Sequence, residues 1–151
     1  MNELTPLQCQ SLLTSSSIAH LAVVDDGAPY VTPISYVMIG DALFVRTSPG
    51  RRIQALRTNP KVCIEVSEYH DDTGDWESVV IFSTAEFVED DRVDQEVISA
   101  FFDKYRNVLG SPLNPGSVLP HEGVTVRFPI DISTGRTSGS YFSVRTRPGL
   151  L

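Results

Sequence analysis

The sequence predicts a mainly β protein, a small antiparallel barrel of six strands with helices attached to it. Several segments are rich in Val, Ile, Tyr and Thr, which are typical of strands. Most connections between them are turns of a few residues, which join antiparallel neighbours. Only three segments have the spacing of amphipathic helices. A chain of 151 residues has the length of one domain, taken here as residues 1–151.

The first half of the chain is predicted to contain one helix and three strands. Thr5 can cap free backbone N–H groups and Pro6 suits a first helical turn, so a helix is expected to begin there and to end near Ser15. Turns at Asp25-Asp26-Gly27 and at Gly40-Asp41 separate three segments rich in β-branched residues. The predicted strands cover residues 18–24, 30–39 and 42–47.

The second half adds two helices and three more strands. Ser48 can cap a short helix with Pro49 in its first turn, and Asn59-Pro60 ends that helix. Asp90 or Asp91 can cap a longer helix. That helix is expected to run to Gly110, the strands to cover 62–67, 76–88 and 123–130, a loop to cover 111–122, and an extended tail to cover 133–151.

The charge of the chain is unevenly distributed. Twelve basic and nineteen acidic residues give a net charge of −7, the wrong sign for a protein that wraps a nucleic acid. No carboxylate lies between Asp41 and Glu65, however, and this stretch holds five of the twelve basic residues. Such a cluster fits either a solvated surface or an anion site. Its members are Arg46, Arg51, Arg52, Arg57 and Lys61.

Other functional classes have little support in the sequence. Cys9 and Cys63 lie in no metal-ligand spacing, and no group of His, Asp and Glu predicts a metal site. The three histidines form no hydrolase pattern, and His20 is expected to be a buried or interface residue. Because the N-terminus has no leader pattern and no apolar segment could span a membrane, a cytoplasmic protein is expected.

The basic cluster begins with a pattern that suits a phosphate group. Arg46 ends an apolar strand, the hydroxyls of Thr47 and Ser48 follow, and Arg51 and Arg52 lie in the next predicted helix. Arginines, hydroxyls and the free N–H groups of a helix start are the donors that phosphate requires. Two charge-assisted contacts of about 1.5 to 3 kcal/mol each do not reach the ~8 kcal/mol of micromolar binding. The ligand is therefore expected to bury an apolar part, such as a ring.

With these features the sequence resembles the flavin-binding split-barrel proteins related to pyridoxamine 5′-phosphate oxidase, including their nitroimidazole-resistance-like members. The similarity runs through residues 18–90 and more weakly through 123–137. It rests on the order and spacing of five short segments. They are Asp26-Gly27-Ala28-Pro29-Tyr30-Val31-Thr32-Pro33, Phe44-Val45-Arg46-Thr47 with Gly50-Arg51-Arg52, Asn59-Pro60-Lys61-Val62, Trp76-Glu77-Ser78-Val79-Val80 and Thr134-Gly135-Arg136.

The resemblance implies a homodimer of six-stranded antiparallel split barrels with FMN at the subunit interface. Arginines and hydroxyls of the basic cluster would hold the phosphate, residues of the second strand would lie along the flavin ring, and two residues of the fifth strand would approach it from either subunit. The cofactor-binding residues implied in this way are Pro33, Ile34, Ser35, Tyr36, Arg46, Thr47, Ser48, Arg51, Arg52, Trp76 and Ser78.

The function implied is that of a flavin-dependent oxidoreductase that acts on a small organic substrate. The flavin would carry the redox chemistry, so no catalytic acid, base or nucleophile is predicted. The substrate-binding signature of true pyridoxamine 5′-phosphate oxidases is not recognisable in residues 133–151, and that substrate is not expected. Two alternatives stay open: a non-catalytic module that stores or senses a flavin, and a deazaflavin-dependent reductase.

Overall fold

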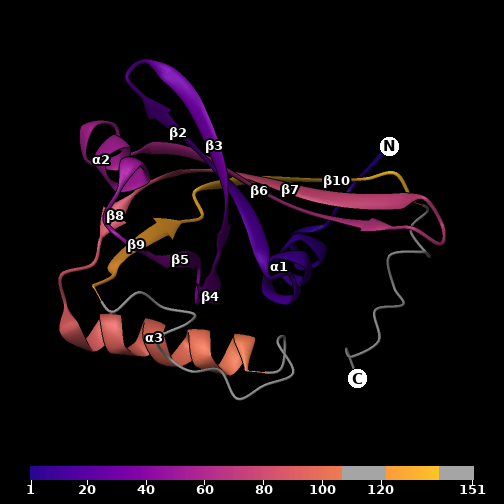
Figure 1. Cartoon of the computed structure of the whole chain (residues 1–151). Helices are drawn as coiled ribbons and strands as arrows, with labels where there is room; N and C mark the ends of the chain where they lie inside the picture. Colours follow the sequence, from indigo (N-terminus) through magenta and orange to yellow (C-terminus); the bar gives the residue numbers. More distant parts are fainter. Residues whose placement is uncertain (107–121, 140–151) are drawn as a thin grey trace.

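The computed structural model describes residues 1–106 and 122–139 and contains two antiparallel sheets with three helices around them (Figure 1). The predicted mainly β class with peripheral helices is confirmed, and the described strands form a split rather than a closed barrel. The helices are α1 (Pro6–Ser15), α2 (Arg51–Thr58) and α3 (Asp91–Tyr105). The strands are β1 (Asn2–Glu3), β2 (Ile18–Asp25), β3 (Ala28–Ser35), β4 (Val37–Ile39), β5 (Ala42–Thr47), β6 (Lys61–His70), β7 (Asp75–Thr84), β8 (Glu86–Phe87), β9 (Val124–Pro129) and β10 (Ile132–Thr137).

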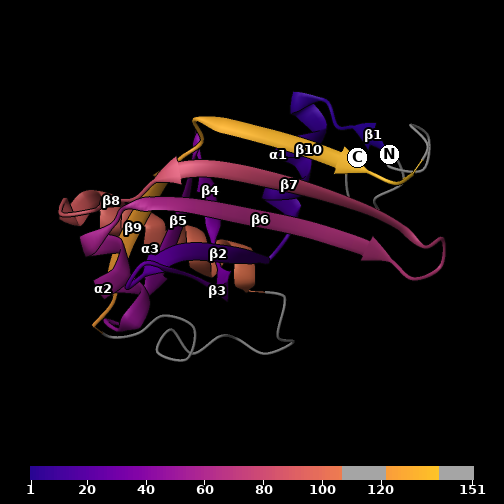
Figure 2. The ribbon, with the colours of Figure 1, turned by 90° about the horizontal axis from the view of Figure 1, so that it is seen from above.

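Two sheets pack against each other around the main core. The larger has the order β1-β10-β7-β6-β2-β3, and the smaller has the order β4-β5-β9-β8. Alternate residues of the strands point inward, and burial of their apolar side chains stabilises the packing. Helix α1 packs on β6 and β7 of the larger sheet, while α3 packs on the smaller one (Figures 1 and 2). Among the largest fully buried side chains are Leu21, Leu43, Ile64, Ile81 and Phe128.

The chain passes from one sheet to the other at Tyr36. The predicted strand 30–39 is therefore two strands, because β3 pairs with β2 whereas β4 pairs with β5. Tyr36 is fully buried, its hydroxyl donates to the Leu13 carbonyl (2.5 Å), and its N–H donates to the Tyr105 hydroxyl (3.0 Å). Residue propensity does not reveal such a change of sheet, since the segments on both sides of it favour strand.

Two later segments also differ from the prediction. The predicted strand 76–88 divides at Ala85 into β7, in the larger sheet, and β8, in the smaller one. The tail from residue 133 is extended as expected as far as Thr137, but it is a paired strand there, because β10 pairs with β7. The described residues therefore contain ten strands where six are predicted. The predicted loop up to residue 121, and residues 140–151, lie outside the described part of the chain.

Side-chain caps fix the starts of two helices as predicted. Thr5 Oγ1 accepts a hydrogen bond from the Gln8 N–H (3.3 Å), and the Gln8 side chain accepts one from the Thr5 N–H (2.8 Å). This reciprocal pair satisfies two backbone donors at the start of α1. Asp90 accepts from the Arg92 N–H (2.8 Å) at the start of α3. The two sequence signals were sufficient because capping is a local interaction.

Two helix ends differ from the prediction. Helix α2 begins at Arg51, and its N-cap is Gly50, so Ser48 is not the capping residue. The Ser48 hydroxyl thus has no role in starting the helix. Helix α3 ends at Tyr105, whereas the prediction extends it to Gly110, which lies outside the described residues. None of the helices in the described part of the chain is long and apolar enough to cross a membrane.

Candidate anion and ring-binding groove

A groove of about 460 Å³ lies where α2 meets β3 and the end of β5. Its walls come from segments that are distant in the sequence, and most of the lining side chains carry a hydroxyl or a positive charge. The groove brings together five of the predicted site residues. Its lining residues are Tyr30, Thr32, Pro33, Thr47, Ser48, Gly50, Arg51 and Arg52.

Arg52 links the segments that form this groove. Its Nη1 donates to Thr32 Oγ1 (3.1 Å) and to the Pro33 carbonyl (3.2 Å), and its Nη2 donates to Thr47 Oγ1 (3.1 Å). These partners are neutral, and Arg52 belongs to none of the ion pairs found among the described residues. The guanidinium is therefore held in position without a carboxylate to balance its charge, which suits the binding of an anion.

Arg51 lines the same groove, but its charge is already balanced. Its Nε donates to the Asp25 carboxylate in an ion pair, and its guanidinium lies 4.2 Å from the centre of the Tyr30 ring. The hydrogen bond to Asp25 raises the pKa of Arg51 above its ordinary value. A phosphate near Arg51 would compete with Asp25, so this arginine is a weaker anion donor than Arg52.

Arg46 does not lie in the groove, contrary to the prediction. Its Nη1 donates to Asp94 Oδ1 (2.7 Å) and Thr125 Oγ1 (3.0 Å), and its side chain is only 10% exposed. The backbone at Gly123 closes over the guanidinium, because a Cβ there would lie 2.6 Å from Arg46 Nε. Arg46 therefore joins β5 to α3 and β9. The alternation of strand residues could have shown this, since Arg46 and Thr47 must face opposite sides of β5.

The predicted ring-contact segment, residues 33–36, is divided by the same alternation. Pro33 is exposed and Ser35 is half-buried, whereas Ile34 is 8% exposed and Tyr36 is fully buried in the core. The side chains of Ile34 and Tyr36 are thus unavailable to a ring on the surface. Of this segment, only Pro33, which lines the groove, and Ser35, two residues further on the same face of β3, remain as candidates for contact with a ring.

Ser78 belongs to a network of polar side chains on the outer face of the larger sheet. Its hydroxyl donates to Glu65 Oε1 (2.9 Å), and Glu65 Oε2 contacts His20 Nδ1 (3.0 Å). Burial acts to raise the pKa of Glu65, but hydrogen bonds from Ser67, His20 and Ser78 outweigh it and lower that pKa. The His20 side chain is half exposed rather than buried, and it stands opposite Pro33 in the strand register. The alternation of side chains along a strand, which can be read from the sequence, predicts that His20 and Glu65 lie on the outer face.

Trp76 lies away from the groove of its own chain. Its backbone N–H donates to Ser138 Oγ (2.8 Å), and its backbone carbonyl accepts from Thr137 Oγ1 (2.9 Å). It stands near the start of β7, opposite Tyr69 of β6. In this chain its backbone therefore holds the end of β10 against β7.

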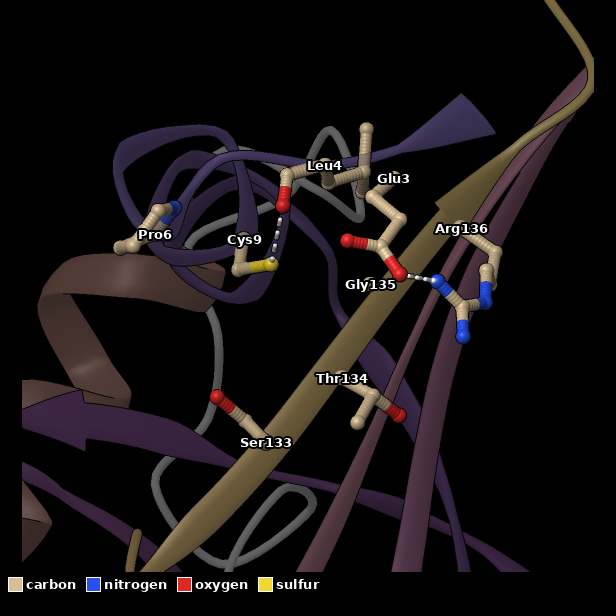
Figure 3. A pocket seen from close by; sticks show the side chains of 8 residues that line it. All are labelled: Glu3, Leu4, Pro6, Cys9, Ser133, Thr134, Gly135 and Arg136. Atoms are coloured by element: carbon tan, nitrogen blue, oxygen red, sulfur yellow. Dashed lines mark hydrogen bonds and ion pairs between the residues drawn. The ribbon is translucent and has the colours of Figure 1, made fainter. Parts of the chain in front are cut away.

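The Thr134-Gly135-Arg136 segment has a structural explanation in the described residues. It borders a small hollow between β10 and the N-terminal segment (Figure 3). A Cβ at Gly135 would lie 2.7 Å from Leu4 Cβ and even closer to Cys9 Sγ, so the backbones approach too closely for a side chain. Arg136 forms an ion pair with Glu3. This segment therefore ties the N-terminus to the larger sheet. The thiol of Cys9, which lies against Gly135, is buried, and burial raises its pKa and makes it less reactive.

Beside the polar network that includes Ser78, the outer face of the larger sheet carries an apolar row that no described helix covers. Figure 2 shows β10, β7, β6 and β2 side by side with no described helix in front of them. Val31, Ala22, Cys63 and Phe82 are successive neighbours across four strands of this face. Val31 is 61% exposed and Phe82 is 52% exposed. An apolar row of this kind is typical of a surface that another protein surface covers.

Comparison with known proteins connects these features with a family. The sequence profile of the pyridoxamine 5′-phosphate oxidase family matches residues 5–137, which include the groove and every described strand except β1. An uncharacterized protein of Rhizobium meliloti is 35% identical over 74 residues, 49% of this chain and 48% of that protein. The match thus spans about half of that relative's length.

Solved structures share the fold over most of the chain. A FAD-binding protein from Mesorhizobium loti is 27% identical, with a TM-score of 0.74 over 91% of this chain and 98% of that one. A candidate 5-nitroimidazole antibiotic resistance protein from Bacteroides thetaiotaomicron is 22% identical, with a TM-score of 0.73 over 90% of this chain and 86% of that one. The second likeness is evidence for the fold alone.

Proposed function

Because the chain belongs to the pyridoxamine 5′-phosphate oxidase family, we propose that its groove binds the phosphate of a flavin nucleotide. The observation that carries this proposal is Arg52, a cation that is fixed by three neutral partners and forms no ion pair within residues 1–106 and 122–139. Thr47 and Ser48 add hydroxyls beside it. Charge-assisted hydrogen bonds of this kind bind phosphate more strongly than neutral ones.

The nucleotide proposed is FMN. FMN carries one phosphate, and the described donors of the groove gather around Arg52, whereas the neighbouring Arg51 is paired with Asp25. FAD, named for the Mesorhizobium loti protein, contains the same flavin with a second phosphate and an adenosine. The Arg52 donors would serve the flavin-linked phosphate of either nucleotide, so the mass of the bound cofactor distinguishes them.

The flavin ring is proposed to lie at the interface of a homodimer. From the phosphate donors, the surface leads over Pro33 toward His20, Glu65 and Ser78 on the uncovered face of the larger sheet. A second copy on this face would bury the apolar row and exclude water from the ring. Residues of the partner, including its Trp76, would complete the site.

The activity proposed is that of a flavin-dependent oxidoreductase for a small organic substrate. When bound, the flavin supplies reversible transfer of electrons and hydride. The chain's own residues anchor the phosphate, orient the ring against Pro33 and keep water away from it. The hydrogen-bonded His20–Glu65 pair lies beside Pro33 on this surface and offers polar groups to a bound ligand.

Identification of the native cofactor tests the binding proposal. The protein is purified without added flavin, denatured, and the released molecule is analysed by mass spectrometry, with the mass of FMN as the expected result. A deazaflavin would support the alternative reductase. If no flavin is released, and added FMN neither raises the melting temperature nor loses fluorescence on mixing, the flavin proposal is wrong.

Turnover separates the enzyme from a storage or sensing module. Reduced nicotinamides serve as electron donors, with nitroaromatic compounds and quinones as acceptors. Rapid, acceptor-dependent reoxidation of the bound flavin supports the oxidoreductase. Tight binding without turnover for any pair supports the non-catalytic alternative.

A further inference from the structure

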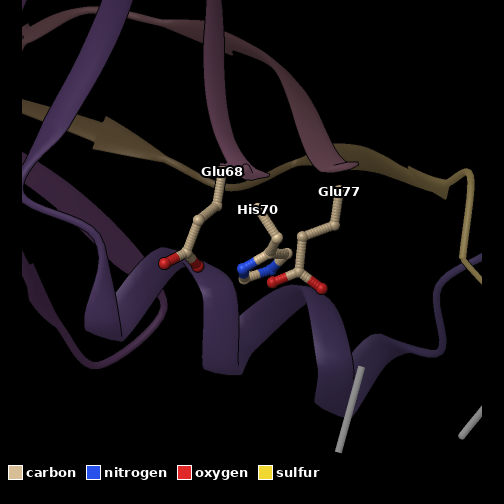
Figure 4. A group of neighbouring side chains, drawn as sticks. All are labelled: Glu68, His70 and Glu77. Atoms are coloured by element: carbon tan, nitrogen blue, oxygen red, sulfur yellow. The ribbon is translucent and has the colours of Figure 1, made fainter. Parts of the chain in front are cut away.

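The free end of the β6–β7 hairpin carries a second cluster of polar side chains, at the far end of the larger sheet from α2 (Figure 1). It consists of Glu68 and His70 on β6 and Glu77 on β7 (Figure 4). None of the three lines the groove of Arg52. The sequence predicts no metal site here, because these residues have no metal-ligand spacing and come together only when β6 pairs with β7.

The strand register explains why the three side chains meet. Glu68 lies directly opposite Glu77 in the antiparallel ladder, just beyond the buried pair Val66 and Val79. His70 is two residues beyond Glu68 and therefore lies on the same face of β6. This is the inner face of the sheet, and Figure 4 shows the three side chains reaching from the strands toward the helix that packs on β6 and β7.

We propose that Glu68, His70 and Glu77 bind a first-row divalent metal ion such as Zn²⁺ or Mn²⁺. One ligand atom from each residue lies within 4.8 Å of the other two. Ligands of a tetrahedral site, each about 2.1 Å from Zn²⁺, lie about 3.4 Å apart. Small rotations of the three side chains are therefore enough to close the site.

The mixture of ligand atoms selects the class of metal. Two carboxylate oxygens and one imidazole nitrogen suit Zn²⁺, Mn²⁺ or Fe²⁺, whereas Ca²⁺ and Mg²⁺ prefer oxygen ligands throughout. Three protein ligands would leave a coordination position for water or another small ligand.

Burial prepares the cluster for a cation. Glu77 is only 3% exposed, so its carboxylate has already lost most of its hydration in the folded chain. Glu68 places a second carboxylate directly across the strands from Glu77, so the cluster offers two negatively charged ligands as well as the imidazole of His70. A metal ion held by both glutamates and by His70 would tie β6 to β7.

Two properties distinguish a metal site from a surface that attracts cations without specific ligands. A metal must displace protons from the imidazole, so the affinity of the site for the metal increases as the pH rises. A site with nitrogen and oxygen ligands also discriminates between ions of equal charge.

The experiment is a calorimetric titration of the full-length, tag-free, EDTA-treated protein with Zn²⁺, Mn²⁺ and Ca²⁺, at mildly acidic and at neutral pH. The expected result is one Zn²⁺ per chain, bound more tightly at neutral pH, with little affinity for Ca²⁺. His70→Ala and Glu77→Gln should each weaken Zn²⁺ binding by roughly 100-fold, since loss of even an outer-shell partner costs a metal site about 10- to 100-fold. His20→Ala is the matched control: it removes an imidazole that is hydrogen-bonded to Glu65 and does not belong to the cluster, so it should leave Zn²⁺ affinity unchanged.

Failure to bind Zn²⁺ would overturn the proposal. Zn²⁺ affinity that survives both substitutions would also overturn it, because the ion would then bind elsewhere. The titration is repeated with FMN present. An unchanged Zn²⁺ affinity is expected there because the cluster and the groove lie at opposite ends of the sheet, whereas competition between the two ligands would contradict the assignment.

Discussion

Arg46 and Thr47 are adjacent in β5 but contact opposite sides of the molecule. Arg46 Nη1 donates to Asp94 Oδ1 of α3 at 2.7 Å, whereas Thr47 Oγ1 accepts from Arg52 Nη2 of α2 at 3.1 Å. The two neighbours thus belong to different networks, one that holds the fold and one that lines the groove. Substitutions at Arg46 and Arg52 should accordingly have different effects.

Arg52→Ala should weaken FMN binding about ten- to a hundredfold, because one charge-assisted contact contributes about 1.5 to 3 kcal/mol. Fluorescence titration with FMN measures this change. The matched control is Arg57→Ala on the same helix, since Arg57 stacks on the Phe87 ring and lies outside the groove. Equal affinities for the two variants would place the phosphate elsewhere.

Arg46→Ala should destabilise the fold and change FMN affinity little. Removal of the guanidinium leaves the partly buried Asp94 carboxylate without its ion-pair partner, at a cost of about 2 to 3 kcal/mol. Urea unfolding measures the loss. A stable Arg46→Ala protein that has lost FMN would contradict the separation of the two networks.

Val31→Lys combined with Phe82→Lys should convert the proposed dimer to a monomer. Both side chains lie exposed in the apolar row of the larger sheet, and two ammonium groups there would oppose its burial against a second copy. Light scattering reports the mass. Leu7→Lys on α1, 78% exposed and outside this row, is the control that should stay dimeric. A monomeric unaltered protein would refute the dimer itself.

Gly135→Ala should destabilise the protein by about 1 to 3 kcal/mol, the usual cost of an overpacked contact. The new methyl group would overlap Cys9 Sγ and approach Leu4 Cβ to 2.7 Å. In a Cys9→Ala background the cost should fall, because the sulfur is gone while the Leu4 contact remains. A double-mutant cycle by thermal unfolding measures this coupling, and additive effects would argue against the close approach.

Stability should depend on pH through Lys104. Burial lowers the pKa of Lys104 from 10.5 to about 8, although the Tyr36 ring, 4.0 Å from Nζ, favours the charged form and acts against this decrease. Between these two values the unfolded chain binds more protons than the folded one, so the lysine makes the free energy of unfolding rise with pH. Urea unfolding across this range should show a smaller rise for Lys104→Met than for the exposed control Lys61→Met. Identical slopes would contradict the assignment.

Local signals in the sequence predicted the local structure well. The Thr5 and Asp90 caps and the turn at Asp25-Asp26-Gly27 appear as expected, and Asp26 and Gly27 adopt the positive φ angles of a tight hairpin. The changes of sheet at Tyr36 and Ala85 were missed. Strand propensity is the same in both sheets, and only the packing of the two sheets decides where a strand ends.

The sequence by itself determined the antiparallel class, most of the elements and the basic stretch from Arg46 to Lys61, because these follow from residue type and spacing along one chain. Only the tertiary structure decided which arginine is available to an anion. Arg46 and Arg52 carry the same charge, but β5 turns Arg46 toward Asp94, while α2 holds Arg52 over the neutral oxygens of Thr32, Pro33 and Thr47. The partners that balance a charge come from distant segments, so only the fold shows that Arg46 has a carboxylate partner and that Arg52 has none among the described residues.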